Sequence, residues 1–246
     1  MSMEFPKELI ELLQTAVSVT ILTGAGISAE SGVPTFRDAQ TGLWAKYDPQ
    51  ELASPYAFEQ NPKLVWEWYQ WRRELIAAAK PNAGHYALVE LEKQVPDFTL
   101  ITQNVDGLHE QAGSQNIVEL HGNITKTKCF ANEHPITQWE DEHVPPCCPQ
   151  CGSLLRPDVV WFGESLPAMT LYTAVNKSKS CDVFLSIGTS SVVQPAASLP
   201  VAAIQNRIPT IEINPAPTPL SPHMSYVLSG TAGEILPRLI SNAFQK

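Results

Sequence analysis

Continuous runs of aliphatic and β-branched residues are the feature of this sequence that most restricts its fold. A strand covered on both faces has such a run, whereas a half-exposed strand alternates apolar and polar residues. Segments with helical spacing separate the runs, as expected where helices connect parallel strands. We therefore predict an α/β fold, a parallel sheet with helices on both faces. The runs are residues 17–24, 97–104, 116–122, 158–163, 181–188 and 210–214.

Two long stretches interrupt this succession of strands. Residues 36–80 carry four of the six Trp and a helical pattern near 61–79, and residues 124–156 carry four of the five Cys. Two insertions into one sheet can pack together as a second, smaller domain. We predict a main domain formed by residues 1–35, 81–123 and 157–246, and a small helical and Cys-bearing domain formed by 36–80 and 124–156.

The charge balance and the lack of a long apolar run argue against nucleic acid and membranes as partners. With 16 Lys and Arg against 25 Asp and Glu, the net charge is −9, which disfavours a phosphate backbone and steers basic protein segments toward the molecule. No stretch approaches the roughly 20 apolar residues of a membrane-spanning helix. The N-terminal segment carries three Glu and lacks the basic start of a signal peptide. We expect no nucleic acid or membrane partner and a cytoplasmic location.

A glycine-rich turn follows the first predicted strand. Gly24, Ala25 and Gly26 open the pattern G-x-G-x-x-A between a strand and a helix. This context predicts that backbone N–H groups and a helix N-terminus hold a pyrophosphate, with a plain tight turn as the alternative. A dehydrogenase would continue to a strand ending in a ribose-binding acid, but the loop GVPTFRD follows here. Its Arg37 is a candidate phosphate ligand, or else part of a surface ion pair.

Polar residues gather after later strands, at the sheet edge where open α/β sheets bind ligands. Gln103, Asn104 and Asp106 lie in TQNVDG, and His121 lies in ELHG. Amide and carboxylate groups suit ribose hydroxyls or an amide, and a His with a pKa near ~6.5 suits a general base. Each piece alone is also typical of a capped turn or a core histidine. Further candidates to contact a nucleotide are Gly188, Thr189, Ser190 and Asn214.

The segments together resemble the sirtuins, the NAD-dependent protein lysine deacylases. The matching motifs are TGAGIS, GVPTFRD, TQNVDGLH, ELHG, CPQCG, RPDVVWFGE, GTSSVV and IN, in family order over residues 20–232. The resemblance implies a Rossmann-like NAD-binding domain and a smaller helical, zinc-ribbon-like domain built from the two insertions. It also implies a cleft between them for NAD and an acyl-lysine peptide.

The resemblance implies a reaction that consumes NAD. The acyl oxygen attacks C1′ of the nicotinamide ribose, nicotinamide leaves, and a base activates a ribose hydroxyl; water then releases lysine and O-acyl-ADP-ribose. By the match, His121 is the base, while Asn104 and Asp106 order the ribose, the nicotinamide amide and a water. The match places Gln103 at the ribose, Ala25, Phe36 and Arg37 around the diphosphate and reacting end, and Gly188, Ser190, Asn214 and Ala232 on the adenosine side. Val160, Phe162, Gly163 and Glu164 resemble the strand that pairs with the substrate backbone.

Tyr69 and Arg72 suggest an acyl preference. Spaced i, i+3, they share one face of a predicted helix, and they resemble the Tyr-x-x-Arg pair of sirtuins that remove succinyl, malonyl and glutaryl groups. A guanidinium and a phenol can pair with a distal carboxylate, whose burial without partners would be costly. The alternative is that both side chains only pack against the nearby Trp residues.

The cysteines depart from the family pattern. A structural zinc normally takes two C-x-x-C pairs, and Cys148 and Cys151 supply the second pair. The first pair is broken, because Asn132 stands three residues after Cys129. His134, or Cys147 by a change of register, is the candidate fourth ligand. The alternative is that no zinc is bound and the segment is held by packing alone.

Two other functions compete with a deacylase. A protein mono-ADP-ribosyltransferase would use the same cleavage of NAD, and acyl-lysine-dependent release of nicotinamide would exclude it. A non-catalytic NAD or ADP-ribose binding module would not need the intact set Asn104, Asp106 and His121. A chain of 246 residues without an appended tail suggests a minimal catalytic core, which we expect to be a monomer.

Overall fold

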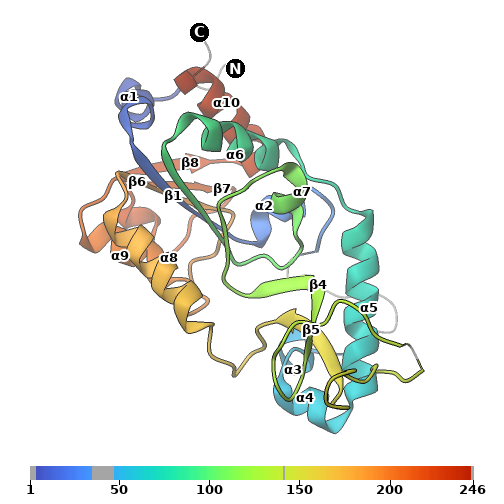
Figure 1. Cartoon of the computed structure of the whole chain (residues 1–246). Helices are drawn as coiled ribbons and strands as arrows, with labels where there is room; N and C mark the ends of the chain where they lie inside the picture. The colour runs from blue at the N-terminus through green and yellow to red at the C-terminus, as the bar shows by residue number, and fades with distance from the viewer. Residues whose placement is uncertain (1–3, 35–46, 141, 245–246) are drawn as a thin grey trace.

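A six-stranded parallel sheet forms the centre of the larger part of the protein (Figure 1). The computed structural model describes residues 4–34, 47–140 and 142–244. Its strands lie in the order β3-β2-β1-β6-β7-β8, with every neighbouring pair parallel. The predicted α/β class and the parallel sheet are confirmed. The strands are β1 (Ser18–Thr23), β2 (Asp97–Thr102), β3 (Ile117–Glu119), β6 (Val183–Ile187), β7 (Thr210–Asn214) and β8 (Tyr226–Ser229).

Helices cover both faces of this sheet, as Figure 1 shows. Within β1, Val19 and Ile21 belong to the apolar cluster on one face, while Leu22 belongs to the cluster on the other. Burial of both faces explains why the strand sequences are continuous apolar runs. The first face carries α1 (Lys7–Thr15), α6 (Ala83–Gln94) and α10 (Ala232–Phe244), and the second carries α8 (Ala168–Ser180) and α9 (Ser198–Gln205).

The smaller part combines helices with a separate two-stranded sheet, at the lower end of Figure 1. Its longest helix, α5 (Pro62–Ala78), begins where Asn61 Oδ1 accepts the backbone N–H of Leu64 at 3.1 Å, with proline at the first helical position. Arg73 ties α5 to the small sheet, because its Nε donates to the carbonyl of Ile124 at 2.6 Å. The other elements are α3 (Pro49–Leu52), α4 (Pro55–Gln60) and the antiparallel pair β4 (Gly122–Cys129) and β5 (Leu155–Val159).

The strand predicted over residues 158–163 is wrong in its bounds and its place. β5 ends at Val159 and pairs antiparallel with β4, outside the six-stranded sheet. Beyond it, the N–H of Val160 donates to the carbonyl of His121 at 2.9 Å and that of Phe162 donates to Ala53 at 2.8 Å. These bonds direct the apolar run along the junction of the two parts. The proposed division at residues 36, 81, 124 and 157 into two domains stays a prediction.

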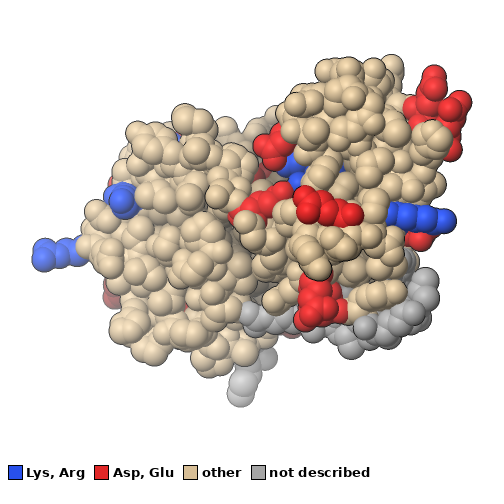
Figure 2. Space-filling view, turned by 90° about the horizontal axis from the view of Figure 1, so that it is seen from below, with Lys and Arg blue, Asp and Glu red and all other residues tan. Residues whose placement is uncertain are grey.

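Acidic side chains gather on one half of the lower face, with few Lys or Arg among them (Figure 2). Glu51 is exposed on helix α3, beside Gln50. None of the helices in the described ranges has the length and apolar composition needed to cross a bilayer. The exposed acids of the smaller part include Glu51, Glu59, Glu67, Glu74, Glu133, Glu140 and Glu142.

Candidate active site

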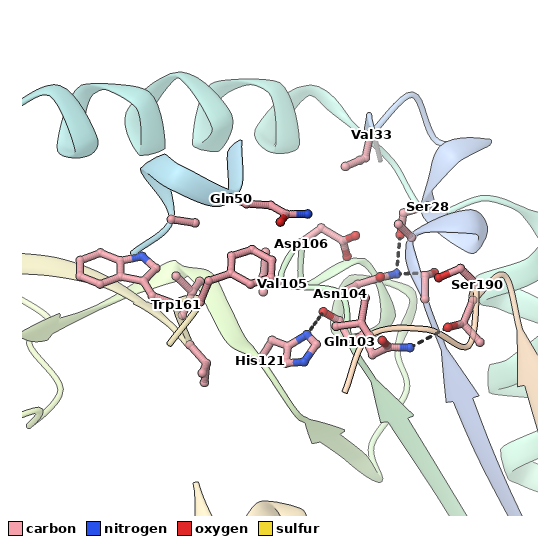
Figure 3. A pocket seen from close by; sticks show the side chains of 18 of the residues that line it. Ser28, Val33, Gln50, Gln103, Asn104, Val105, Asp106, His121, Trp161 and Ser190 are labelled. Carbon is pink, nitrogen blue, oxygen red and sulfur yellow. Dashed lines mark hydrogen bonds between the residues drawn. The ribbon is translucent and has the colours of Figure 1, made fainter. Parts of the chain in front are cut away.

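A cavity of about 520 Å³ lies at the carboxyl ends of β1, β2 and β6 and extends to α5. It opens where β1 has β2 on one side and β6 on the other, which is the crevice that open α/β sheets use for ligands. Figure 3 shows Trp161 on one side of this space and Ser190 on the other, with Asn104 and His121 between them. The predicted residues that line it are Gly24, Ala25, Gly26, Tyr69, Arg72, Gln103, Asn104, Asp106, His121, Val160, Phe162, Gly163, Glu164, Gly188, Thr189, Ser190 and Asn214.

The glycine turn acts through close packing of backbones. The N–H of Gly24 donates to Ile187 at 3.0 Å, and the N–H of Gly26 donates to Gly188 at 2.8 Å. A Cβ on Gly26 would lie 2.7 Å from the Cα of Gly188, and Gly188 itself has a φ of +59°. Two of the N–H groups expected to face a pyrophosphate are therefore used inside the fold. The glycines hold the turn after β1 against the end of β6 and leave the cavity open above it.

Amide side chains after β2 are fixed by the same turn. Asn104 Nδ2 donates to the carbonyl of Gly24 and to Ser28 Oγ, both at 3.0 Å. Gln103 Nε2 donates to Thr189 Oγ1 at 3.0 Å. Because its N–H hydrogens point to the turn, Asn104 keeps its carbonyl oxygen for a ligand. Ser28 was not predicted, although its position inside GAGIS was the available signal.

His121 has a defined tautomer. Its Nδ1 lies 3.0 Å from the backbone carbonyl of Gln103. A carbonyl can only accept, so Nδ1 carries the hydrogen in the neutral ring and Nε2 keeps its lone pair. Burial lowers the pKa of His121, and the bond to Gln103 partly offsets this. The ring is consequently a neutral base at physiological pH.

Asp106 faces the same cavity and is nearly fully buried. Burial raises the pKa of its carboxyl group, while the N–H of Leu108, donating at 2.9 Å, lowers it. The positive charge of Arg72 also lowers the pKa of Asp106. The carboxyl group thus anchors the loop after β2 and faces the guanidinium of α5.

Tyr69 and Arg72 both lie on α5, three residues apart as the sequence spacing predicted, and both line the cavity. Tyr69 is buried, and its Oη accepts the indole N–H of Trp161 at 2.9 Å. The guanidinium of Arg72 lies 5.1 Å from the ring centroid of Trp68. Sequence reasoning missed Trp161, because a Trp inside an apolar run is typical of a core residue.

The segment after β5 lines the cavity but has few free backbone donors. The N–H groups of Val160 and Phe162 are bonded within the fold, as described above. Glu164 binds Arg156 through two bonds, of 2.5 and 2.9 Å. Burial raises the pKa of Glu164, but these bonds and the N–H of Trp161 lower it by more. Glu164 is therefore an anionic anchor of this segment.

One predicted residue lies elsewhere. Ala232 is buried at the start of α10, where its Cβ would lie 3.2 Å from a Cβ added to Gly84. It packs between helices and does not line the cavity. Phe36 and Arg37 lie outside the described residues.

Comparison with known proteins gives the family. Residues 24–195 match the model of the Sir2 family. The chain belongs to the Sir2 family. This sirtuin is 55% identical to the NAD-dependent protein deacylase of Aquifex aeolicus over 83% of its own length and 86% of the relative. It is 49% identical to the one of Pyrococcus furiosus over 95% and 96%.

Solved structures agree with this placement. A crystal structure of a Sir2 homologue–NAD complex superposes with a TM-score of 0.91 at 46% identity, over 98% of this chain and 94% of the other. A Sir2 complex with a p53 peptide and NAD⁺ superposes with a TM-score of 0.86 at 31% identity, over 97% and 98%. The predicted family and its Rossmann-like fold are confirmed.

The sirtuin also has a thiol cluster outside the cavity lining. The sulfurs of Cys129, Cys148 and Cys151 all lie within 4.8 Å of one another, and zinc–sulfur bonds of about 2.3 Å place tetrahedral thiolates roughly 3.8 Å apart. The three thiols therefore fit a zinc ion, and His134 Nε2 lies 3.3 Å from Cys148 Sγ beside them. Neither His134 nor Cys147 belongs to this group of described ligand atoms, and Cys147 pairs with Leu154 in an isolated bridge.

Proposed function

We propose that this sirtuin is an NAD-dependent protein lysine deacylase that transfers the acyl group of a lysine to ADP-ribose and releases nicotinamide. One observation carries the proposal: a single cavity joins a neutral histidine base, an amide fixed by the glycine turn and a Tyr–Arg pair. The relatives named as deacylases support it.

The roles of the residues follow from their contacts. Asn104, held by Gly24 and Ser28, orients the ribose and the nicotinamide amide together with Asp106. His121 takes the proton of a ribose hydroxyl at Nε2, because Nδ1–H is committed to Gln103. The glycine turn and Gly188 leave room for the diphosphate, and Gln103, Ser190 and Asn214 line the ribose and adenosine side.

For the substrate class, we propose acyl groups that end in a carboxylate, beside acetyl. Arg72 supplies a guanidinium group, which stays protonated and positively charged in proteins, and Tyr69 supplies a neutral hydroxyl. Burial raises the pKa of Tyr69 to about 12, so its proton is retained. The two groups would pair with a succinyl or malonyl carboxylate and offset the cost of burying it.

Mass spectrometry of matched acetyl-lysine and succinyl-lysine peptides, with and without NAD, tests both proposals. We expect NAD-dependent loss of the acyl group with formation of nicotinamide and O-acyl-ADP-ribose, and no reaction in His121→Ala. Transfer of ADP-ribose to the peptide would indicate the transferase, NADH absorbance a dehydrogenase, and no turnover a binding module.

Arg72→Met tests the acyl class separately. Removal of the charge should reduce kcat/KM for the succinyl peptide about 100-fold, since a buried carboxylate loses its ionic partner. The acetyl peptide carries no such charge and should be turned over within about twofold of wild type. Equal loss with both peptides contradicts a carboxylate pocket.

Three further expectations remain proposals. We propose a structural zinc at Cys129, Cys148, Cys151 and His134, a cytoplasmic location, and a monomer without nucleic-acid or membrane partners. The net charge of −9 supports the absence of nucleic acid. Light scattering on the purified protein measures the oligomeric state directly.

A further inference from the structure

The hydrogen bond between Trp161 and Tyr69 determines how the Tyr69 hydroxyl can bind a group in the cavity. Trp161 Nε1 lies 2.9 Å from Tyr69 Oη, and both residues are buried. An indole N–H only donates, so Tyr69 Oη must accept. The phenol has a single hydrogen, and the Trp161 bond leaves that hydrogen to a different partner. The uncharged Trp161 side chain thus sets the direction in which the Tyr69 hydroxyl donates.

Trp161 is held firmly enough to act in this way. Its side chain is 1% exposed, and the Arg156 guanidinium lies 3.3 Å from its ring centroid. Arg156 is in turn bonded to Glu164, which also accepts the backbone N–H of Trp161 at 2.7 Å. Phe58 packs on the ring with a centroid distance of 5.2 Å. The indole cannot turn away from Tyr69 without losing its stacking on Arg156 or its packing against Phe58.

The hydroxyl lies one helical turn from a guanidinium. Tyr69 and Arg72 are three residues apart on α5 and line the same cavity, so both can reach one group in it. A neutral donor aimed beside a cation favours an anionic oxygen over an apolar methyl.

We propose that Trp161 is a specificity-determining positioning residue that directs the Tyr69 hydroxyl hydrogen toward the carboxylate of a substrate's acyl group. The inference rests on the proposed deacylase function and its carboxylate-ended substrates. Trp161 touches no reacting atom and acts through Tyr69. It therefore affects binding of succinyl-lysine or malonyl-lysine and leaves the shared chemistry of acyl transfer unchanged.

Trp161→Phe is the test, because it removes the N–H and keeps an aromatic ring under Arg156. The expected result is a KM for the succinyl peptide raised about tenfold, the loss of one hydrogen bond to a charged group, at nearly constant kcat. The KM for the acetyl peptide stays within about twofold. In a Tyr69→Phe background the same change should add nothing, because the bond is already gone. Trp66→Phe, a buried Trp of α5 outside the cavity lining, is the matched control.

A measurement on the unaltered protein covers the case in which the variant does not fold. Donation by the phenol to a carboxylate makes Oη a stronger acceptor, because hydrogen bonds in a chain polarise one another. Succinyl-lysine peptide should then move the Trp161 indole proton resonance, one of six in the chain, downfield, whereas acetyl-lysine peptide should not.

The outcomes separate this inference from the proposed function. Three outcomes overturn the role of Trp161 alone, provided that the wild type removes succinyl groups. They are an unchanged KM for the succinyl peptide in Trp161→Phe, an equal rise in KM for both peptides, and an indole shift of the same size with both peptides. If the wild type removes acetyl groups but neither succinyl nor malonyl groups, both the carboxylate pocket and the role of Trp161 are overturned. The absence of any NAD-dependent deacylation overturns all three.

Discussion

At the scale of single residues, two histidines are buried next to the carboxyl ends of β1 and β2, where the cavity begins. His85 on α6 and His109 on α7 (Leu108–Ala112) have ring centroids 4.8 Å apart. His109 Nε2 lies 3.0 Å from Thr23 Oγ1, which donates to Thr102 at the end of β2. His85 Nε2 and His109 Nδ1 have no hydrogen-bond partner among the described residues. Neither ring can accept a second proton without burying a charge.

This pair predicts acid sensitivity of folding. Burial lowers the pKa of His85 to about 4 and, with the charge of His85 added, that of His109 to about 3. Below the unfolded pKa of ~6.5, the unfolded chain binds protons that the folded chain refuses. The free energy of unfolding should therefore fall as the pH drops from about 6.5 toward 4, by up to ~1.4 kcal/mol per unit for each histidine.

Denaturant unfolding at several pH values between about 7 and 5 measures this slope. His109→Gln keeps a polar side chain that does not titrate, so its slope should be shallower than that of wild type. Comparing slopes instead of absolute stabilities removes the packing cost of the substitution. Equal slopes in the two proteins would contradict the assignment of this acid sensitivity to His109.

At the scale of elements, the loop between β4 and β5 depends on its thiol cluster. The N–H groups of Ala131 and Asn132 are directed at Cys129 Sγ, and the N–H of Cys129 donates to the carbonyl of His134 at 3.0 Å. The loop thus turns back on itself at the position where the family pattern has its second cysteine. This turn brings His134 to Cys148.

Metal analysis of variants tests the fourth ligand. Wild type and Cys147→Ser should each purify with about one zinc per chain, and His134→Ala should lose most of it, because a structural site needs four ligands. Loss in Cys147→Ser and retention in His134→Ala would assign the ligand to Cys147. A wild type free of metal would mean that packing alone holds the loop.

The small sheet also marks the limit of prediction from sequence. Asn104, Asp106 and His121 were found because parallel strands bring their carboxyl ends to one edge, a rule that needs no knowledge of packing. The partner of β5 could not be read this way, since β4 lies more than two dozen residues upstream and its GNITKTKC sequence carries no pairing signal. Trp161 was missed for the related reason that a hydrogen bond between distant segments leaves no local pattern.

At the scale of the whole molecule, charge and site lie close together. Glu51 is exposed on α3, between Gln50, which lines the cavity, and the cavity-lining Ala53. We expect the net charge of −9 and the exposed acids of the smaller part to attract cationic peptides to this end.

Peptides with the same acyl-lysine but different flanks test this attraction. We expect a lower KM with Lys and Arg flanks than with Asp and Glu flanks. The difference should shrink as salt rises from about 0.01 to 1 M, because the screening length falls from about 30 to 3 Å. A difference that does not respond to salt would point to direct contacts instead of the long-range field.

The bond between Gly26 and Gly188 has a consequence for how the protein is made. During synthesis the turn at residue 24 leaves the ribosome long before residue 188, yet its backbone is held by that later segment. β1 likewise has β2, the next strand in the chain, on one edge and β6, which is synthesised much later, on the other. A nascent chain that ends before β6 lacks part of the cavity lining, so growing chains and truncated products do not have the complete site proposed for NAD.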